Sequence, residues 1–253
     1  MVSTFPDPAA LALLLAAAFV AGALNAVAGG GSFLTLPALV FTGVSPVVAN
    51  ATGTVALLSG YVSSAWGFRE GLRPPAGLSM RALLGWALLG GSAGAGLLLV
   101  TEERTFRALV PWLLLLATAL FAAGPVLLKR LQGGQGPAWR SAVGVLLVSL
   151  YGGYFNGGLG ILLLALFGLL GEHDLRVMNG LKNVVSAVLT AVAVAVYAAG
   201  GVVLWPQALC MMVAAVAGGY LGARAARRVP PVVLRAGIVL TGLVMAAVFF
   251  VRG

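Results

Sequence analysis

Charged residues are scarce in this sequence. Of its 253 residues, 8% are charged and 61% are hydrophobic, whereas a soluble domain carries about 25% charged residues. So few charges cannot cover a surface that faces water, which excludes a soluble enzyme and a nucleic-acid-binding protein. The 15 Lys and Arg residues outnumber the 6 Asp and Glu residues and stand in short clusters between apolar tracts, as in membrane-protein loops.

Cysteine and histidine each occur once, as Cys210 and His173. One cysteine cannot form an intramolecular disulfide, and neither residue has the second ligand that a Cys- or His-based metal site needs. Asp and Glu are absent from the long apolar tracts, which argues against a carboxylate proton relay or cation site inside a membrane. We therefore expect no metal, no cofactor and no enzymatic activity.

Long apolar tracts dominate what is present. Residues 8–68 contain no charged side chain, and a bilayer span needs about 20 apolar residues, so this stretch enters and leaves the membrane more than once. Similar tracts follow at 82–100, 109–128, 141–171, 177–201, 202–223 and 236–251. Strand alternation is weak, and helices then satisfy the backbone in lipid. The sequence predicts an all-α polytopic membrane protein with about eight transmembrane spans.

The two halves of the chain resemble each other. A shift of 129 positions superposes Gly29 on Gly158, Gly31 on Gly160, Asn50 on Asn179, and Gly90 on Gly219. Chance is the alternative, because the chain has 36 glycines. The common order of features favours duplication, with a first transmembrane repeat at 1–128, a polar linker at 129–140 and a second repeat at 141–253. The small-residue pairs Gly90/Gly94 and Gly218/Gly222 predict close helix packing.

The distribution of basic residues favours inverted repeats. Eight simple crossings would put seven basic residues on each side, against the usual cytoplasmic excess. If each Gly-rich break turns the chain into a hairpin, loops 69–81, 129–140 and 224–235 share one side with ten basic residues. Arg104, Arg107, Arg176 and Arg252 then lie on the other side. Gly-broken or re-entrant helices in inverted repeats are typical of secondary transporters.

Polar residues gather at equivalent places of the two halves. The first cluster contains Asn25, Gly29, Gly30, Gly31, Ser32, Asn50, Thr52 and Thr54. The second contains Tyr151, Tyr154, Asn156, Gly157, Gly158, Gly160, Asn179, Lys182, Asn183 and Ser186. A helix that starts after a glycine break directs its N–H groups and its positive end inward, which suits an anion. We expect Ser32 to cap such a helix, and the alternative is that the glycines only permit close packing.

Lys182 is the strongest single candidate for a functional residue. It lies within an apolar helix between Asn179 and Asn183, where a lysine costs about 2.5–3.5 kcal/mol on insertion scales. If it points into the bundle, its natural partner is an anion, and the alternative is a side chain that reaches the membrane interface. The Glu172-His173-Asp174 run is interpreted as a solvated loop whose Asp174 caps the next helix.

Several motifs together resemble one family. They are Asn25–Ser32 with Phe33-Leu34-Thr35-Leu36-Pro37, Ala49–Thr52, Gly157–Gly160, Met178–Asn183, Gly218–Ala223 and Arg227–Pro231. This order is similar to that of the sulfite exporter TauE/SafE family. The resemblance implies a multi-pass transporter of the bacterial cytoplasmic (inner) membrane that exports small sulfur oxyanions such as sulfite or organosulfonates.

The sequence is compatible with more than one transport mechanism and oligomeric state. We expect alternating access around an anion site at the midplane of the lipid bilayer, and the other reading is a passive anion channel built from the same parts. The second glycine motif is less complete than the first, so the two halves need not contact the substrate equally. Small-residue faces would also suit a homodimer.

Overall fold

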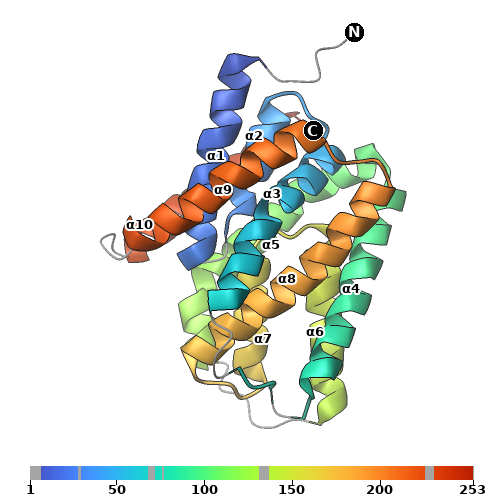
Figure 1. Ribbon diagram of the computed structural model, residues 1–253, viewed down its shortest axis with the longest axis vertical. Coiled ribbons are helices and arrows are strands. Elements are labelled where there is room, and N and C mark those ends of the chain that lie inside the picture. The colour runs from blue at the N-terminus through green and yellow to red at the C-terminus, as the bar shows by residue number, and fades with distance from the viewer. Residues whose placement is uncertain are drawn as a thin grey trace.

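The computed structural model describes residues 7–27, 30–67, 72–75, 77–130, 137–225 and 231–252. Within these ranges all regular structure is α-helical (Figure 1). The helices are α1 (Pro8–Val27), α2 (Ser32–Phe41), α3 (Pro46–Gly67), α4 (Met80–Val100), α5 (Glu103–Arg130), α6 (Ala138–Tyr154), α7 (Leu159–Leu169), α8 (Leu175–Ala199), α9 (Trp205–Ala225) and α10 (Pro231–Arg252). Gly29 and residues 131–136 of the predicted linker lie outside the described residues.

Helix length separates two classes of helix. Among the described residues, α1, α4 and α8 contain segments long and apolar enough to cross a membrane. By contrast, α2 has 10 residues and α7 has 11, or roughly 15 Å at the helical rise, about half of a bilayer core. The all-helical membrane architecture is confirmed, while the number of eight spans stays a prediction.

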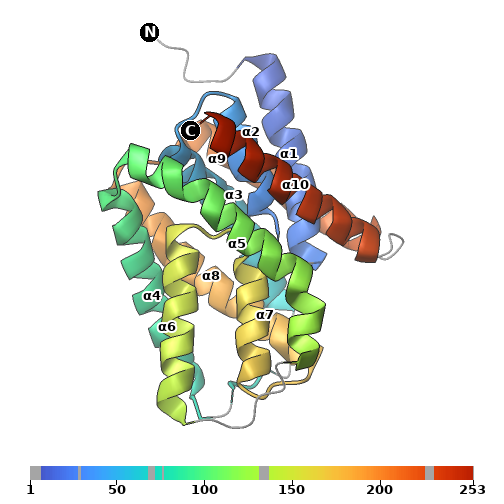
Figure 2. The same ribbon diagram turned by 180° about the vertical axis from the view of Figure 1, so that it is seen from behind.

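The two short helices belong to two hairpins that enter from opposite ends of the bundle. The chain descends α1 from the N-terminal end, and α2 returns toward that end (Figure 1). From the other end α6 rises, and α7 returns to it (Figure 2). The Ser32 hydroxyl donates to the carbonyl oxygen of Asn156 at 3.4 Å. Because each returning arm is short, the two hairpin tips meet inside the molecule.

Glycines set the close contacts between the long helices. α1 packs along α9 and α4 along α6, while α3 and α8 pack together at the centre. A Cβ atom at Gly94 would collide with the carbonyl oxygen of Leu150, and one at Gly218 with that of Phe19. Gly90 lies against α6 in the same way. The predicted close packing at these three glycines is confirmed, and the surroundings of Gly222 lie outside the described side chains.

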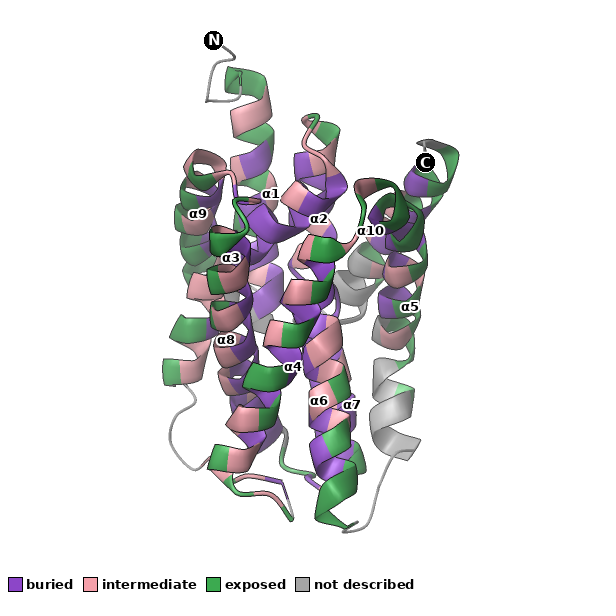
Figure 3. Ribbon diagram, turned by 90° about the vertical axis from the view of Figure 1, so that its right-hand side faces the viewer, coloured by how far each residue is buried: buried purple, intermediate pink, exposed green. Residues whose placement is uncertain are grey.

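The outer faces of the bundle are apolar. Leu89 of α4, Leu147 of α6 and Val213 of α9 are exposed, and Figure 3 shows exposed positions along the outside of α4 and α6. Trp112 and Trp139 are also exposed. Large apolar faces of this kind are unfavourable in water and suit contact with lipid, which agrees with the membrane class that composition predicts.

One salt bridge corrects the predicted membrane side of Arg176. The loop before α4 carries Arg73, whose Nε lies 3.0 Å from Oε2 of Glu172 in the α7–α8 turn. That turn therefore lies at the same end of the bundle as the α3–α4 loop, and Arg176 at the start of α8 lies there too. The expectation that Arg176 faces the opposite side is wrong, because α7 returns to the end from which α6 came.

Candidate functional site

The first hairpin tip is built around Asn25 of α1. This side chain is buried, and its Oδ1 accepts the backbone N–H of Gly31 at 3.2 Å. Gly30 and Gly31 are buried, and a Cβ atom at Gly31 would lie 2.8 Å from the carbonyl oxygen of Ala21. Only glycine fits there. The expected cap by Ser32 is wrong, because Ser32 is the first residue of α2 and its hydroxyl donates to Asn156 instead.

The second tip is a short left-handed turn. Asn156 has φ +59° and Gly158 has φ +70°, a region that glycine and asparagine tolerate better than other residues. The Tyr151 hydroxyl donates to the carbonyl oxygen of Gly157 at 2.7 Å, and the Tyr197 hydroxyl donates to that of Gly153. The predicted break residues 156–160 are all buried. Two tyrosines thus hold the backbone where the helix is interrupted.

Helix α3 holds the second tip through two side chains. The Tyr61 hydroxyl donates to Oδ1 of Asn156 at 3.4 Å, and Nδ2 of Asn50 donates to the carbonyl oxygen of Tyr154 at 3.0 Å. With the Ser32–Asn156 contact, these bonds connect residues about 100 positions apart in the chain. Sequence reasoning missed Tyr61, although a single tyrosine in a tract without charge was a signal.

Two amide groups at the tips have donors without acceptors. Nδ2 of Asn25 and Nδ2 of Asn156 are buried and form no hydrogen bond of good geometry with any described residue, although the Tyr61 hydroxyl lies beside Asn25. Leaving such a group unpaired costs about 1–3 kcal/mol. The first tip leads into the N-terminus of α2 and the second into that of α7, where helix dipoles are positive. This region therefore offers donors to a buried acceptor.

Helix α8 contributes a polar stripe. Asn179, Lys182, Asn183, Ser186 and Thr190 follow helical spacing on one side of it. Lys182 is only 2% exposed, and its amine donates to Oδ1 of Asn179 at 3.1 Å. The alternative in which this lysine reaches the interface does not hold.

The stripe passes the hairpin tips. Ala187 packs in the same apolar cluster as Leu57 and Tyr61. Lys182 precedes it by five residues, which is about 7.5 Å along the helix axis. The hydroxyls of Ser186 and Thr190 are buried without a hydrogen-bond partner among the described residues. Helix α8 thus carries further free polar atoms close to the level of Tyr61.

The remaining predicted site residues have different positions in the structure. Thr54 is buried and its hydroxyl donates to the carbonyl oxygen of Asn50 at 2.7 Å, within α3. The Thr52 hydroxyl accepts the N–H of Leu204 at 3.1 Å, so it holds the start of α9 and does not face the tips. Asn183 is buried on α8, and Gly29 is outside the described residues.

Outside the apolar tracts, the Glu172 carboxylate has a strongly lowered pKa. Arg73 donates to both of its carboxylate oxygens at 3.0 Å. This hydrogen bonding lowers the pKa of Glu172 to about 2, assisted by the N–H groups of Asp174 and His173 and opposed by burial. Asp174 caps α8 by accepting the N–H of Arg176 at 2.8 Å, as predicted. The loop interpretation missed that Glu172 is buried.

Comparison with known proteins agrees with this architecture. The family model described as sulfite exporter TauE/SafE matches residues 14–249. A "Probable membrane transporter protein" of Haemophilus influenzae is 30% identical over 253 residues, covering 94% of this chain and 93% of that protein. "Probable membrane transporter protein YfcA" of Escherichia coli K12 is 26% identical over 249 residues, covering 95% and 90%. "Probable membrane transporter protein ORF9" of a Sinorhizobium species is 27% identical over 248 residues, covering 93% and 90%.

These matches extend over nearly the whole chain, through both hairpins and the helices that hold them. The relatives are named as transporters, and the described helices have the apolar outer faces of a multi-pass membrane protein. The chain belongs to the sulfite exporter TauE/SafE family of membrane transporters.

Proposed function

We propose that this protein is a secondary transporter of the bacterial cytoplasmic membrane that exports small sulfur-containing anions, such as sulfite or organosulfonates. The observation that carries the proposal is the meeting of two helix breaks whose free polar groups include the amide donors of Asn25 and Asn156. A transporter site at the junction of two discontinuous helices, with their N-termini toward an anionic group, has precedent in other folds.

The charge balance of this region supports an anion as cargo. The amine of Lys182 is buried. The acidic residues of the described chain are Asp7, Glu102, Glu103, Glu172 and Asp174, and all lie in loops, turns or the first turn of a helix. A cation would find no carboxylate beside the breaks, whereas an oxyanion would accept hydrogen bonds from amides, an amine and helix N-termini.

The packing supports two inverted repeats with the boundaries given above. At a shift of 129 positions, α1–α5 correspond in order to α6–α10. Under this shift the α1–α9 contact is equivalent to the α6–α4 contact. The α3–α8 contact joins equivalent helices of the two halves, and so does the α5–α10 contact. The two hairpins open toward opposite ends (Figures 1 and 2). Such an arrangement gives two related halves that can rock around one site, which is the basis of alternating access.

Reconstitution into liposomes tests the proposal. Liposomes loaded with unlabelled anion would receive labelled sulfite, an organosulfonate, thiosulfate or sulfate, with and without a pH gradient. We expect saturable uptake of sulfite or the sulfonate that internal substrate accelerates, while protein-free liposomes take up none. No protein-dependent movement of any of these anions would overturn the transporter assignment. Flux without saturation or counterflow stimulation would instead support the second candidate, a passive anion channel.

A further inference from the structure

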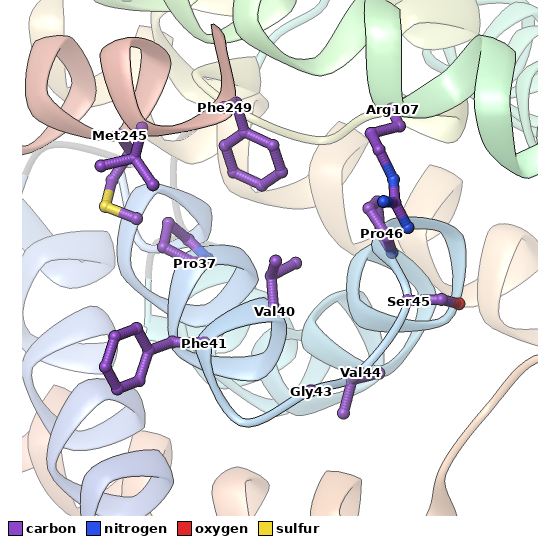
Figure 4. A pocket seen from close by; sticks show the side chains of 11 residues that line it. Pro37, Val40, Phe41, Gly43, Val44, Ser45, Pro46, Arg107, Met245 and Phe249 are labelled. Carbon is purple, nitrogen blue, oxygen red and sulfur yellow. The ribbon is translucent and has the colours of Figure 1, made fainter. Parts of the chain in front are cut away.

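A cavity of about 370 Å³ lies at the end of the bundle opposite the Arg73–Glu172 salt bridge. Its walls come from the end of α2, the α2–α3 turn, the first turns of α5 and the last turns of α10 (Figure 4). The volume is within the range of small-molecule pockets. This cavity is separate from the hairpin tips, since none of Asn25, Asn156 or Lys182 lines it.

The two sides of the cavity differ in chemistry. Phe41, Met245 and Phe249 form an apolar side, and Arg107 extends from α5 over Pro46 on the other side (Figure 4). An apolar wall that faces a cation fits a molecule with a hydrocarbon part and an anionic group. A purely polar ion such as sulfite would leave the apolar side without a partner.

The guanidinium of Arg107 is available for such a ligand. It forms no salt bridge with any described residue. Glu103, one turn earlier on α5, instead directs Oε1 to the N–H of Val47 at 3.5 Å, at the start of α3. Arginine binds oxyanions through paired N–H groups, and this geometry favours sulfonate and carboxylate groups.

We propose that this cavity binds organic anions, with Arg107 on the oxyanion group and the α2 and α10 side chains on a short hydrocarbon chain. The inference deepens the proposed function and rests on it in one respect, because it makes organosulfonates rather than inorganic sulfite the preferred cargo. Pro37 and Val40 of the cavity belong to the same ten-residue helix that begins at the first hairpin tip. Helix α2 thus connects the cavity to the first hairpin tip.

Equilibrium binding of labelled 1-hexanesulfonate to the full chain in phosphatidylcholine nanodiscs tests this site. We expect saturable binding that Arg107→Gln weakens at least tenfold and that Arg107→Lys, which keeps the charge but loses the paired N–H donors, weakens less. Arg104→Gln is the matched control, because Arg104 is exposed nearby on α5 and does not line the cavity. Unlabelled hexanesulfonate should compete at least tenfold better than sulfite. Size-exclusion profiles would show that each variant is folded.

Three outcomes would overturn the inference. They are equal affinities of wild type and Arg107→Gln, equal competition by sulfite, or an acidic lipid that copurifies with wild type, depends on Arg107 and blocks hexanesulfonate binding. The outcome for the proposed function is separate. Arg107-dependent binding without transport in liposomes would leave the site and remove the transporter. Transport together with equal binding by wild type and Arg107→Gln would remove the site and leave the transporter.

Discussion

At the scale of single residues, the buried amine of Lys182 is unusual because the chain has so few charged residues. Its only hydrogen bond that the structure describes is to Asn179, a neutral partner that leaves its charge uncompensated. At the position 129 residues earlier the first half has Gly53, so the two halves contribute charge unequally. This asymmetry agrees with the less complete glycine motif of the second half.

Removing the charge of Lys182 tests its role in anion binding. We expect Lys182→Gln to lower uptake at subsaturating substrate by about tenfold or more, because hydrogen bonds to charged groups contribute about 1.5–3 kcal/mol. Arg81→Gln, which removes an exposed charge at the start of α4, should leave uptake unchanged. Normal uptake by Lys182→Gln in proteoliposomes would remove this lysine from the site.

Tyr61 provides a second test at this scale. Its hydroxyl orients the Asn156 side chain, and one such hydrogen bond contributes about 0.5–1.5 kcal/mol. Tyr61→Phe should therefore raise the KM for transport by roughly two- to tenfold while the protein remains folded. Ser63→Ala, at an exposed position of the same helix α3, is the control. An unchanged KM in Tyr61→Phe would mean that this contact is only structural.

At the scale of helices and loops, glycine contacts decide how closely α4 and α6 approach. A Cβ at Gly94 meets the backbone of Leu150, whereas one at Gly96 meets nothing within 4 Å. Gly94→Ala should reduce stability by about 1–3 kcal/mol, the usual cost of overpacking, and Gly96→Ala should not. The thermal midpoints of the two variants in the same detergent give the comparison. Equal midpoints would contradict the close helix crossing.

The salt bridge between the α3–α4 loop and the α7–α8 turn predicts an acid-sensitive contact. The folded pKa of Glu172 is about 2, below its ordinary 4.5. A depressed pKa gives stability that is complete above about pH 4.5 and is lost as pH falls toward 2.

Removing this carboxyl should remove that acid sensitivity. The thermal midpoint of Glu172→Gln should therefore fall less between pH 5 and pH 2.5 than that of wild type or of Glu102→Gln, which alters an exposed carboxylate. Parallel pH curves for wild type and Glu172→Gln would show that the bridge contributes nothing to stability.

At the scale of the whole molecule, sequence patterns predicted the elements better than their contacts. The helix breaks at the glycine motifs, the close packing at Gly90 and Gly94, and the Asp174 cap were all predicted, because each depends on local spacing and composition. The number of spans and the repeat boundaries stay predictions.

Contacts between distant segments could not be predicted in the same way. Tyr61 meets Asn156 across 95 positions, and Arg73 meets Glu172 across 99, and no local pattern specifies either pair. The side of Arg176 was predicted wrongly for the same reason, since it depends on where α7 returns. The cavity beside Arg107 combines four helices, and its two-sided chemistry appears only when they pack.

The central claim is that an anion binds where the two hairpin tips meet. The most direct measurement is anomalous diffraction from crystals of the full chain soaked with selenite, a heavier analogue of sulfite. We expect a selenium peak within hydrogen-bonding distance of the Asn25 and Asn156 amides, and no peak there in crystals of a Lys182→Gln variant that binds no sulfite. Selenium bound only elsewhere, with the tips unchanged and empty at saturating selenite, would contradict the account.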